Sequence, residues 1–230
     1  TTEEDDLLQV PLSTNFVQNS SAYIGGGDYN SAFGEHSTIG GGFDNKAGPA
    51  AVVGGGELNE ANVTYATAGG GVSNKANAYC ATVAGGKENS IENSFSAVGG
   101  GWQNFVGGHY SNITGGQSNS VIGSYSTSSG GVFNRVTGHY AVVTGGSSNS
   151  AMSSFAAILG GSGNTVYGTS SVVIGGTSNK VSGQNSLVFG SDITTTSDDI
   201  GVFNFGAAQC EQGDPGTLTI CTNAGVIIDG

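Results

Sequence analysis

The sequence is poor in charge, and the charge it has is almost all of one sign. Only 10% of its 230 residues are charged, with 17 Asp or Glu against five Lys or Arg, which gives a formal net charge of −12. Such a surface repels polyanions, so binding to nucleic acid and docking on anionic lipid are not expected. No apolar run approaches the roughly 20 residues of a transmembrane helix, so membrane insertion is not expected either.

Proline, methionine and cysteine are scarce, with three, one and three copies, whereas glycine occurs 43 times. Glycine does not fall at every third position and proline is rare, which excludes a collagen helix. A disordered glycine-rich linker is excluded as well, because Val, Ile and Ala return at fixed intervals. We therefore interpret the glycines as turn and packing residues of an ordered chain.

What the chain has instead is a strict repeat. Asparagine recurs every 15 residues from Asn15, with one interval of 14, and a glycine pair stands three and four positions before every later member. A fixed short period is typical of a solenoid, in which each repeat is one coil stacked on the next. The later asparagines are predicted to form a hydrogen-bonded ladder that holds the turn: Asn30, Asn45, Asn59, Asn74, Asn89, Asn104, Asn119, Asn134, Asn149, Asn164 and Asn179.

Small and apolar residues recur at spacings of two on both sides of each asparagine, a pattern that predicts two short strands per coil with one face inward. The predicted fold is all-β, a parallel β-solenoid (β-roll) of about 11–12 coils with a 15-residue repeat. The repeat domain spans 15–190. It lies between an N-terminal extension or cap at 1–14 and a C-terminal β cap or assembly segment at 191–230.

The C-terminal segment has a different pattern from the repeats. The sequence Gly-Asp-Pro-Gly at 213–216 is a strong turn signal between two β-type runs, 202–210 and 217–221. We therefore expect a β-hairpin that caps the solenoid. Cys210 and Cys221 are nearly symmetric about the turn, so a disulfide between them is expected in an oxidising compartment. A cap protects the open sheet end, although the same segment can equally join subunits end to end.

Two sets of outward positions are candidate contact surfaces. Aliphatic rows in the last three coils are typical of a partner surface, unless the C-terminal segment folds back over them. One aromatic residue per coil recurs in five consecutive coils, and these rings either seal a corner of the roll or form an exposed ridge for glycan or protein contact. The first set is Leu159, Ile174, Phe189, Val172 and Leu187, and the second is Phe95, Tyr110, Tyr125, Tyr140 and Phe155.

No sequence motif indicates catalysis or cofactor binding. The glycine-rich turns lack the phosphate loop G-x-x-x-x-G-K-S/T, and the calcium-roll motif G-G-x-G-x-D is approached only at 160–164, where asparagine replaces the carboxylate. His109 and His139 lie two coils apart, roughly 10 Å at strand spacing, which is too far to share one metal ion. We expect neither an enzyme, nor a bound metal, nor a cofactor.

Sequons of the type N-x-S/T occur at Asn19, Asn62 and Asn112 and are candidate glycosylation sites in a eukaryotic secretory pathway. The alternative is chance, because Asn, Ser and Thr are so common in this chain. A composition of Asn, Ser, Thr and Gly with few charges is typical of secreted repeat proteins. We therefore expect an extracellular or cell-surface location.

Written as S-x-V-x-G-G-x-x-N-x-V-x-G, the repeat resembles the head repeats of YadA-like trimeric autotransporter adhesins over about residues 15–190. The runs STIGGG at 37–42 and SVVIGG at 171–176 carry the resemblance. It implies a left-handed parallel β-roll with two short strands per coil. The repeat is longer here than is common in that family, and the cysteine pair lies outside the family pattern.

The leading hypothesis is an extracellular structural or adhesive β-solenoid that acts as a subunit of a trimer or filament. Self-association is then the main interaction, with a glycan or matrix protein as the candidate further partner. An ice-binding (antifreeze) solenoid is one alternative, because a flat solenoid face can order water. Its threonine row would be interrupted, however, because only Thr38, Thr67, Thr82 and Thr127 occupy one outward column. A phage- or virus-type fibre segment is the other alternative.

Overall fold

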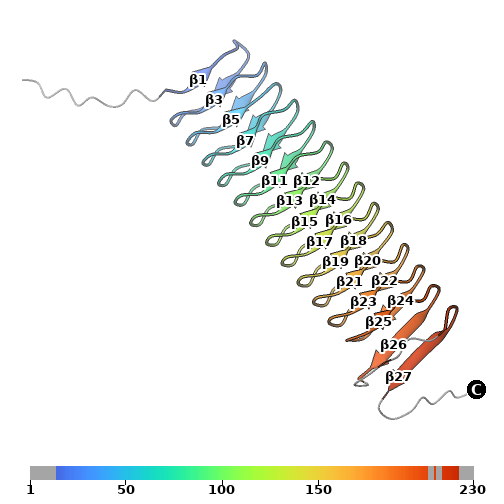
Figure 1. Cartoon of the computed structure of the whole chain (residues 1–230). Helices are drawn as coiled ribbons and strands as arrows, with labels where there is room; N and C mark the ends of the chain where they lie inside the picture. Colours follow the sequence, from blue (N-terminus) through green and yellow to red (C-terminus); the bar gives the residue numbers. More distant parts are fainter. Residues whose placement is uncertain (1–13, 207–209, 211–213, 223–230) are drawn as a thin grey trace, which may run out of the picture.

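The computed structural model describes residues 14–206, 210 and 214–222, which wind into a straight parallel β-solenoid (Figure 1). Each coil contributes one strand to a sheet of 13 strands, here sheet A, and one to a sheet of 14 strands, here sheet B. This part of the chain contains no helix. The predicted all-β solenoid with a 15-residue repeat is confirmed, with about 13 coils in place of 11–12.

The strands are short, and each lies beside the equivalent strand of the next coil. Sheet A consists of β1 (Phe16–Val17), β3 (Ser31–Ala32), β5 (Lys46–Ala47), β7 (Glu60–Ala61), β9 (Lys75–Ala76), β11 (Ser90–Ile91), β13 (Phe105–Val106), β15 (Ser120–Val121), β17 (Arg135–Val136), β19 (Ser150–Ala151), β21 (Thr165–Val166), β23 (Lys180–Val181) and β25 (Thr194–Thr195). Sheet B consists of β2 (Tyr23–Ile24), β4 (Thr38–Ile39), β6 (Val52–Val53), β8 (Thr67–Ala68), β10 (Thr82–Val83), β12 (Ala97–Val98), β14 (Asn112–Ile113), β16 (Thr127–Ser128), β18 (Val142–Val143), β20 (Ala157–Ile158), β22 (Val172–Val173), β24 (Leu187–Phe189), β26 (Gly201–Phe205) and β27 (Leu218–Thr222).

Neighbouring coils are in register. Thr82 pairs with Ala97, fifteen positions on, and Thr38 pairs with Val52 across the 14-residue interval. A third ladder of isolated bridges begins at Asp28 and follows the glycine-rich turns along the rod. The coils from Asp28 to Thr177 are therefore tied to one another along three lines, which explains why the stack in Figure 1 is so regular.

The glycine-rich turn requires glycine at its second position. Gly100 and Gly101 have positive φ values of 146° and 90°, and a Cβ on Gly101 would lie 2.1 Å from the carbonyl oxygen of Gly116 in the next coil. Two other positions per coil are left-handed without being glycine, as at Gln103 (φ 56°) and Tyr110 (φ 53°). These residues interrupt the extended backbone, so most strands are only two residues long.

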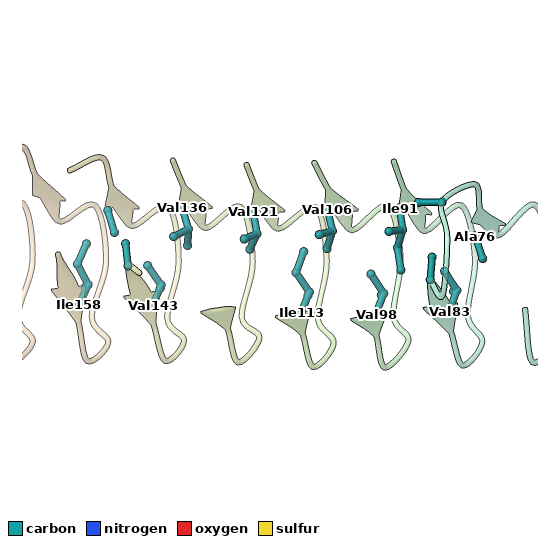
Figure 2. Close-up of a cluster of buried hydrophobic side chains, with 14 of the residues drawn as sticks. Ala76, Val83, Ile91, Val98, Val106, Ile113, Val121, Val136, Val143 and Ile158 are labelled. Atoms are coloured by element: carbon teal, nitrogen blue, oxygen red, sulfur yellow. The ribbon is translucent and has the colours of Figure 1, made fainter. Parts of the chain in front are cut away.

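The core is a narrow file of side chains between the two sheets. Figure 2 shows Ile91, Val106 and Val121 of sheet A opposite Val98 and Ile113 of sheet B, and all five are buried. Each coil buries only a few such side chains. These side chains form one continuous but narrow core from Ala32 to Val202, so the stability of the rod is a sum over many coils and the contacts between neighbours.

The C-terminal end differs from the predicted arrangement. β26 and β27 pair in parallel, with Phe203 opposite Ile220, so the predicted β-hairpin is wrong. The predicted turn does form at 214–216, where the Thr217 N–H donates to the Asp214 carbonyl oxygen (3.2 Å). It lies directly before β27 and is a corner of one further coil. A turn signal does not specify strand direction, and here the new strand joins an edge of sheet B whose strands all run the same way.

The predicted disulfide between Cys210 and Cys221 is confirmed, with the two Cα atoms 5.6 Å apart. Coil pairing continues past residue 190, since β25 pairs with β23 and β26 with β24. Residues 1–13 of the predicted N-terminal cap and 223–230 of the predicted C-terminal segment lie outside the described residues.

Candidate interaction surfaces

The part of the chain that the structure describes offers no cluster for metal chemistry, since it contains no group of three or more His, Cys, Asp or Glu able to hold an ion. Nor does it contain a helix long and apolar enough to cross a membrane. What the rod offers are long columns of equivalent side chains. Two kinds of column turn inward, and the others form an aromatic ridge and the outward faces of the two sheets.

The asparagine column is buried and fully hydrogen-bonded. The Asn74 side-chain amide donates to the carbonyl oxygens of Gly70 (2.8 Å) and Gly86 (2.7 Å), and to Asn59 Oδ1 (3.2 Å). Its own Oδ1 accepts from the backbone N–H (3.1 Å) and side-chain amide (3.0 Å) of Asn89. Every polar atom of the side chain is thus occupied by the coil and its two neighbours. The column holds the turn and leaves nothing for a ligand.

A second buried ladder, of serines, was not predicted from the sequence. Ser111 Oγ donates to the Gly123 carbonyl oxygen (2.8 Å) and accepts from the Ser126 backbone N–H (3.2 Å). Ser126 Oγ in turn accepts from the Ala141 backbone N–H (3.1 Å) of the next coil. Sequence reasoning treated this column as small packing residues, because alanine alternates with serine in it. The serine hydroxyls satisfy backbone groups at the corner opposite the asparagines.

The aromatic column forms a ridge on the outside of that second corner. Successive rings of Phe95, Tyr110, Tyr125, Tyr140 and Phe155 stack with centroids 4.9–5.2 Å apart and planes within 7°. The side chains are 47–56% exposed, so they do not seal the corner. We call these five residues the aromatic ridge. The sequence left open whether these rings seal a corner or form an exposed ridge, and in the structure they are exposed.

The ridge extends further towards the N-terminus than the sequence column indicated. Tyr79 lies edge-to-face against Phe95 (5.5 Å) and against Tyr65 (5.7 Å). Tyr79 was missed because it stands one position before Cys80, which occupies the column itself. The pKa of Tyr79 is raised above its ordinary value, chiefly by the charge of the neighbouring Cys80 and then by desolvation.

The conformation of the ridge residues shows that stability alone does not account for them. All five are left-handed, with φ between 53° and 58°, a conformation that costs a residue with a side chain about 1–2 kcal/mol. Stacking of an aromatic pair contributes about 0.5–1.5 kcal/mol, which roughly offsets that cost. Ser170 and Asn185 occupy the equivalent position in later coils, and asparagine is among the residues that adopt this conformation most readily. The ridge is therefore close to neutral for folding.

The outward face of sheet B carries no charged side chain in any described coil. Two outward columns make up this face, and they flank the buried valines and isoleucines. Column 1 is Tyr23, Thr38, Val52, Thr67, Thr82, Ala97, Asn112, Thr127, Val142, Ala157, Val172, Leu187, Gly201 and Leu218. Column 2 is Gly25, Gly40, Gly54, Gly69, Ala84, Gly99, Thr114, Ser129, Thr144, Leu159, Ile174, Phe189, Phe203 and Ile220.

Sheet A presents the opposite character. Four of the five cations of the chain lie in one outward column of this sheet, Lys46, Lys75, Arg135 and Lys180. Lys46 Nζ lies 3.3 Å from Glu60 Oε1, and Lys180 lies 5.8 Å from the ring centroid of Tyr167. The absence of charge on sheet B is therefore a property of that face and not of the rod as a whole.

The predicted partner residues lie together at the C-terminal end of the sheet B face. Leu159, Ile174 and Phe189 are exposed in column 2, and Val172 and Leu187 are half-buried in column 1. The structure extends this patch with Phe203, Phe205, Leu218 and Ile220, of which Phe205 and Leu218 are 58% and 63% exposed. β26 and β27 lengthen the sheet and do not fold over the patch.

The three candidate glycosylation sites differ in how free their amides are. The Asn19 amide donates to the Phe33 carbonyl oxygen (3.0 Å), and the Asn62 amide donates to Glu60 Oε2 (3.2 Å). Asn112 stands in column 1 on the flat face of sheet B. A glycan on Asn112 would cover that face. The three sites stay predictions.

The chain matches no protein-family model and no curated protein, so its resemblance to YadA-like adhesin heads stays an expectation drawn from the repeats.

Proposed function

We propose that the chain is a structural or adhesive rod, located outside the cell or on its surface, that acts as a subunit of an assembly such as a trimer or filament. The observation that carries the proposal is the uncharged face of sheet B with its exposed apolar end. Copies of a chain with a net charge of −12 repel one another over most of their surface. On a face without charge, association meets the least electrostatic repulsion. Burying its exposed aliphatic and aromatic side chains also gives the largest hydrophobic stabilisation.

The construction of the rod supports a mechanical role. Two parallel sheets, the bridge ladder and the asparagine ladder tie each coil to its neighbours along most of the described length. Twelve steps at a strand spacing of about 4.8 Å give a rod of about 60 Å. Such an element can hold two points at a fixed distance without any chemistry of its own, and we propose that it is not an enzyme.

The Cys210–Cys221 disulfide supports a location outside the reducing cytosol, because such bonds persist in oxidising compartments. The extracellular or cell-surface part of the proposal rests on this bond together with the sparse charge of the chain.

The aromatic ridge supports an adhesive role. Exposed tyrosine is enriched where proteins bind other proteins. The ring faces of Tyr110, Tyr125 and Tyr140 are covered by their neighbours, so edges and hydroxyl groups are what a partner meets. A sugar stacks on an open ring face, whereas a protein surface can engage ring edges and hydroxyls. The geometry therefore favours a matrix-type protein over a glycan as the partner.

Native mass measurement of the full chain over a range of concentrations tests the assembly part of the proposal. We expect a defined oligomer or an open polymer. A strict monomer at high concentration would contradict the proposed self-association. Adhesion is tested separately, by binding to immobilised matrix proteins and glycans. The comparison is between the native chain and a variant with Tyr110, Tyr125 and Tyr140 changed to Ser. Serine is suited to this position, because Ser170 occupies it with a φ of 58°.

Ice binding is the second candidate, and the glycine-rich end of the sheet B face favours it. From β2 to β12 this face is uncharged, and glycine fills most of column 2, so the surface is flat. Measuring the thermal hysteresis of the purified chain tests ice binding directly. Hysteresis that disappears in a Thr67→Lys, Thr82→Lys double variant would establish ice binding, and its absence from the native chain would remove it.

A further inference from the structure

Column 2 of sheet B grows steadily in side-chain size from one end of the rod to the other. Its first six positions are glycine or alanine, the next three are threonine or serine, and the last five are leucine, isoleucine or phenylalanine. The face is therefore low at the N-terminal end and raised at the C-terminal end. A flat partner would touch only the raised end. A partner can contact the whole face only if its own surface is raised opposite the glycine end and low opposite the apolar end.

A second copy of the chain has that taper when it is turned around. We propose that two copies pack through their sheet B faces with the rods antiparallel, related by a two-fold axis that lies along the strand direction between β14 and β16. This inference rests on the proposed self-association and specifies its first contact. The same patch then serves both copies, as in any isologous interface.

The resulting pairing places glycine or alanine opposite a larger side chain at six of the seven levels of column 2. Rotation about an axis along the strands keeps column 2 opposite column 2, and places the n-th strand of sheet B opposite the n-th from the other end. The facing pairs, each made twice, are Gly25 with Ile220, Gly40 with Phe203, Gly54 with Phe189, Gly69 with Ile174, Ala84 with Leu159, Gly99 with Thr144, and Thr114 with Ser129. With parallel rods, the large side chains would meet one another and hold the glycine ends apart.

Column 1 is compatible with the same arrangement at its inner levels, whereas two large exposed side chains, Tyr23 and Leu218, face each other at the outermost level. Thr67 faces Val172, and Val52 faces Leu187, so apolar or methyl-bearing groups meet. At the centre Asn112 faces Thr127, the point at which the two-fold axis passes. Two polar side chains meet there and can hydrogen-bond across the axis, so neither is buried without a partner.

The area of the face fits a stable pair only if its whole length is used. Thirteen steps of about 4.8 Å and a width of about three residues at 3.3 Å give roughly 600 Å² per copy, against about 800 Å² in a standard interface. The apolar end alone, from β18 to β27, supplies well under half of the area of a standard interface. The glycine end is therefore needed as the surface against which the apolar end packs.

The low end of the face is built into the coil. A Cβ on Gly54 would lie 2.2 Å from the Gly69 carbonyl oxygen, and one on Gly40 equally close to that of Gly54. Substituting these glycines would disturb the solenoid itself. A test of the pairing therefore has to use column 1, where Thr67 and Val172 are partly exposed and no such constraint applies.

A charge-swap experiment tests the antiparallel pairing. Val172→Glu and Thr67→Lys are made singly and together in the full chain, and dissociation constants are measured by sedimentation equilibrium. We expect Val172→Glu to weaken association at least about tenfold, because it buries a carboxylate opposite an uncharged surface. The double variant restores association, since the introduced lysine of each copy then faces the introduced glutamate of the other. Thr165→Glu on the outward face of β21 is the matched control and leaves association unchanged.

The outcomes separate the two proposals. In a parallel pair or a trimer, positions 67 and 172 are seven coils apart, about 34 Å, so the double variant would not recover and the antiparallel pairing would be overturned while self-association stood. A native chain that is strictly monomeric would overturn both. Circular dichroism and thermal unfolding of each variant check the fold. If Val172→Glu does not fold, Thr82→Lys with Ala157→Glu repeats the test at the neighbouring pair.

Discussion

The two corners of each coil share one period and one backbone conformation, yet they serve different purposes. At the asparagine corner, left-handed Gln103 precedes Asn104, whose side chain turns inward and is fully buried. At the aromatic corner, left-handed Tyr110 turns its own side chain outward, where it is half exposed. A repeat therefore shows where equivalent residues stack, and only the direction of the side chain shows whether the stack holds the rod together or faces a partner.

The largest effect is expected at the asparagine corner. Asn104→Ala leaves the Gly100 carbonyl oxygen (2.9 Å from the Asn104 amide nitrogen) and the Asn119 backbone N–H (3.0 Å from Oδ1) without a partner. The Gly116 carbonyl oxygen loses one of its two donors and keeps the Trp102 backbone N–H (3.0 Å). Each orphaned buried group costs about 1–3 kcal/mol, so we expect a loss of about 4 kcal/mol in the free energy of unfolding, measured by urea denaturation. Asn112→Ala on the outward face is the control. A loss below about 1 kcal/mol for Asn104→Ala would contradict the structural role of the ladder.

A smaller effect is expected at the buried serine ladder of the aromatic corner. Ser111→Ala removes the bond to the Gly123 carbonyl oxygen (2.8 Å) and the acceptor for the Ser126 N–H (3.2 Å). Alanine already fills the equivalent position at Ala81 and Ala141, so the coil accommodates it. We expect the free energy of unfolding to fall by about 1 kcal/mol, again by urea denaturation. A loss as large as that of the asparagine variant would mean that the two inward columns contribute equally to stability.

The smallest effect on stability, and the largest on binding, is expected at the aromatic ridge. Tyr125→Gly loses two stacking contacts, at 5.0 Å to Tyr110 and to Tyr140, but removes the Cβ that makes a left-handed backbone costly. The two terms are of similar size, so the midpoint of thermal unfolding stays within a few degrees of the native value. Retention of the matrix-protein partner is expected to fall. A variant that unfolds readily but binds normally would show that the ridge is structural after all.

The sequence was sufficient for the period, the inward apolar columns and the asparagine turn, because each of these repeats in every coil and its chemistry allows one arrangement. It was insufficient where a feature occurs once. The Gly-Asp-Pro-Gly turn at 213–216 was identified, but not the sense of the strand that follows it, since that depends on the edge of sheet B and not on the turn. Tyr79 was missed because it joins the ridge from a neighbouring position.

The exposure of the aromatic rings and the extension of the apolar end of the sheet B face beyond Phe189 were also beyond the sequence pattern. Tyr110 occupies a corner whose left-handed backbone sets the direction of its side chain, and no hydrophobic period encodes that direction. Phe203 and Ile220 became part of the face only because β26 and β27 continue sheet B in parallel. Both features depend on three-dimensional placement rather than on residue spacing.

A pH-dependent contribution to stability is expected from Glu88, which lies on the outer side of the asparagine corner. Its pKa is lowered, first by the hydrogen bond from Gln103 Nε2 (2.8 Å) and then by that from Trp102 Nε1 (3.2 Å). A lowered folded-state pKa stabilises the fold above the unfolded pKa, and that contribution is lost as the pH falls through the folded value. Gln103→Leu should therefore raise the pKa of Glu88, as followed by NMR titration of its carboxyl carbon. The carboxylate is on the surface, so the midpoint of unfolding at neutral pH is expected to change little. A pKa that does not move would show that the Gln103 amide does not hold the carboxylate, and that this outer hydrogen bond, unlike those of the asparagines beneath it, does not connect neighbouring coils.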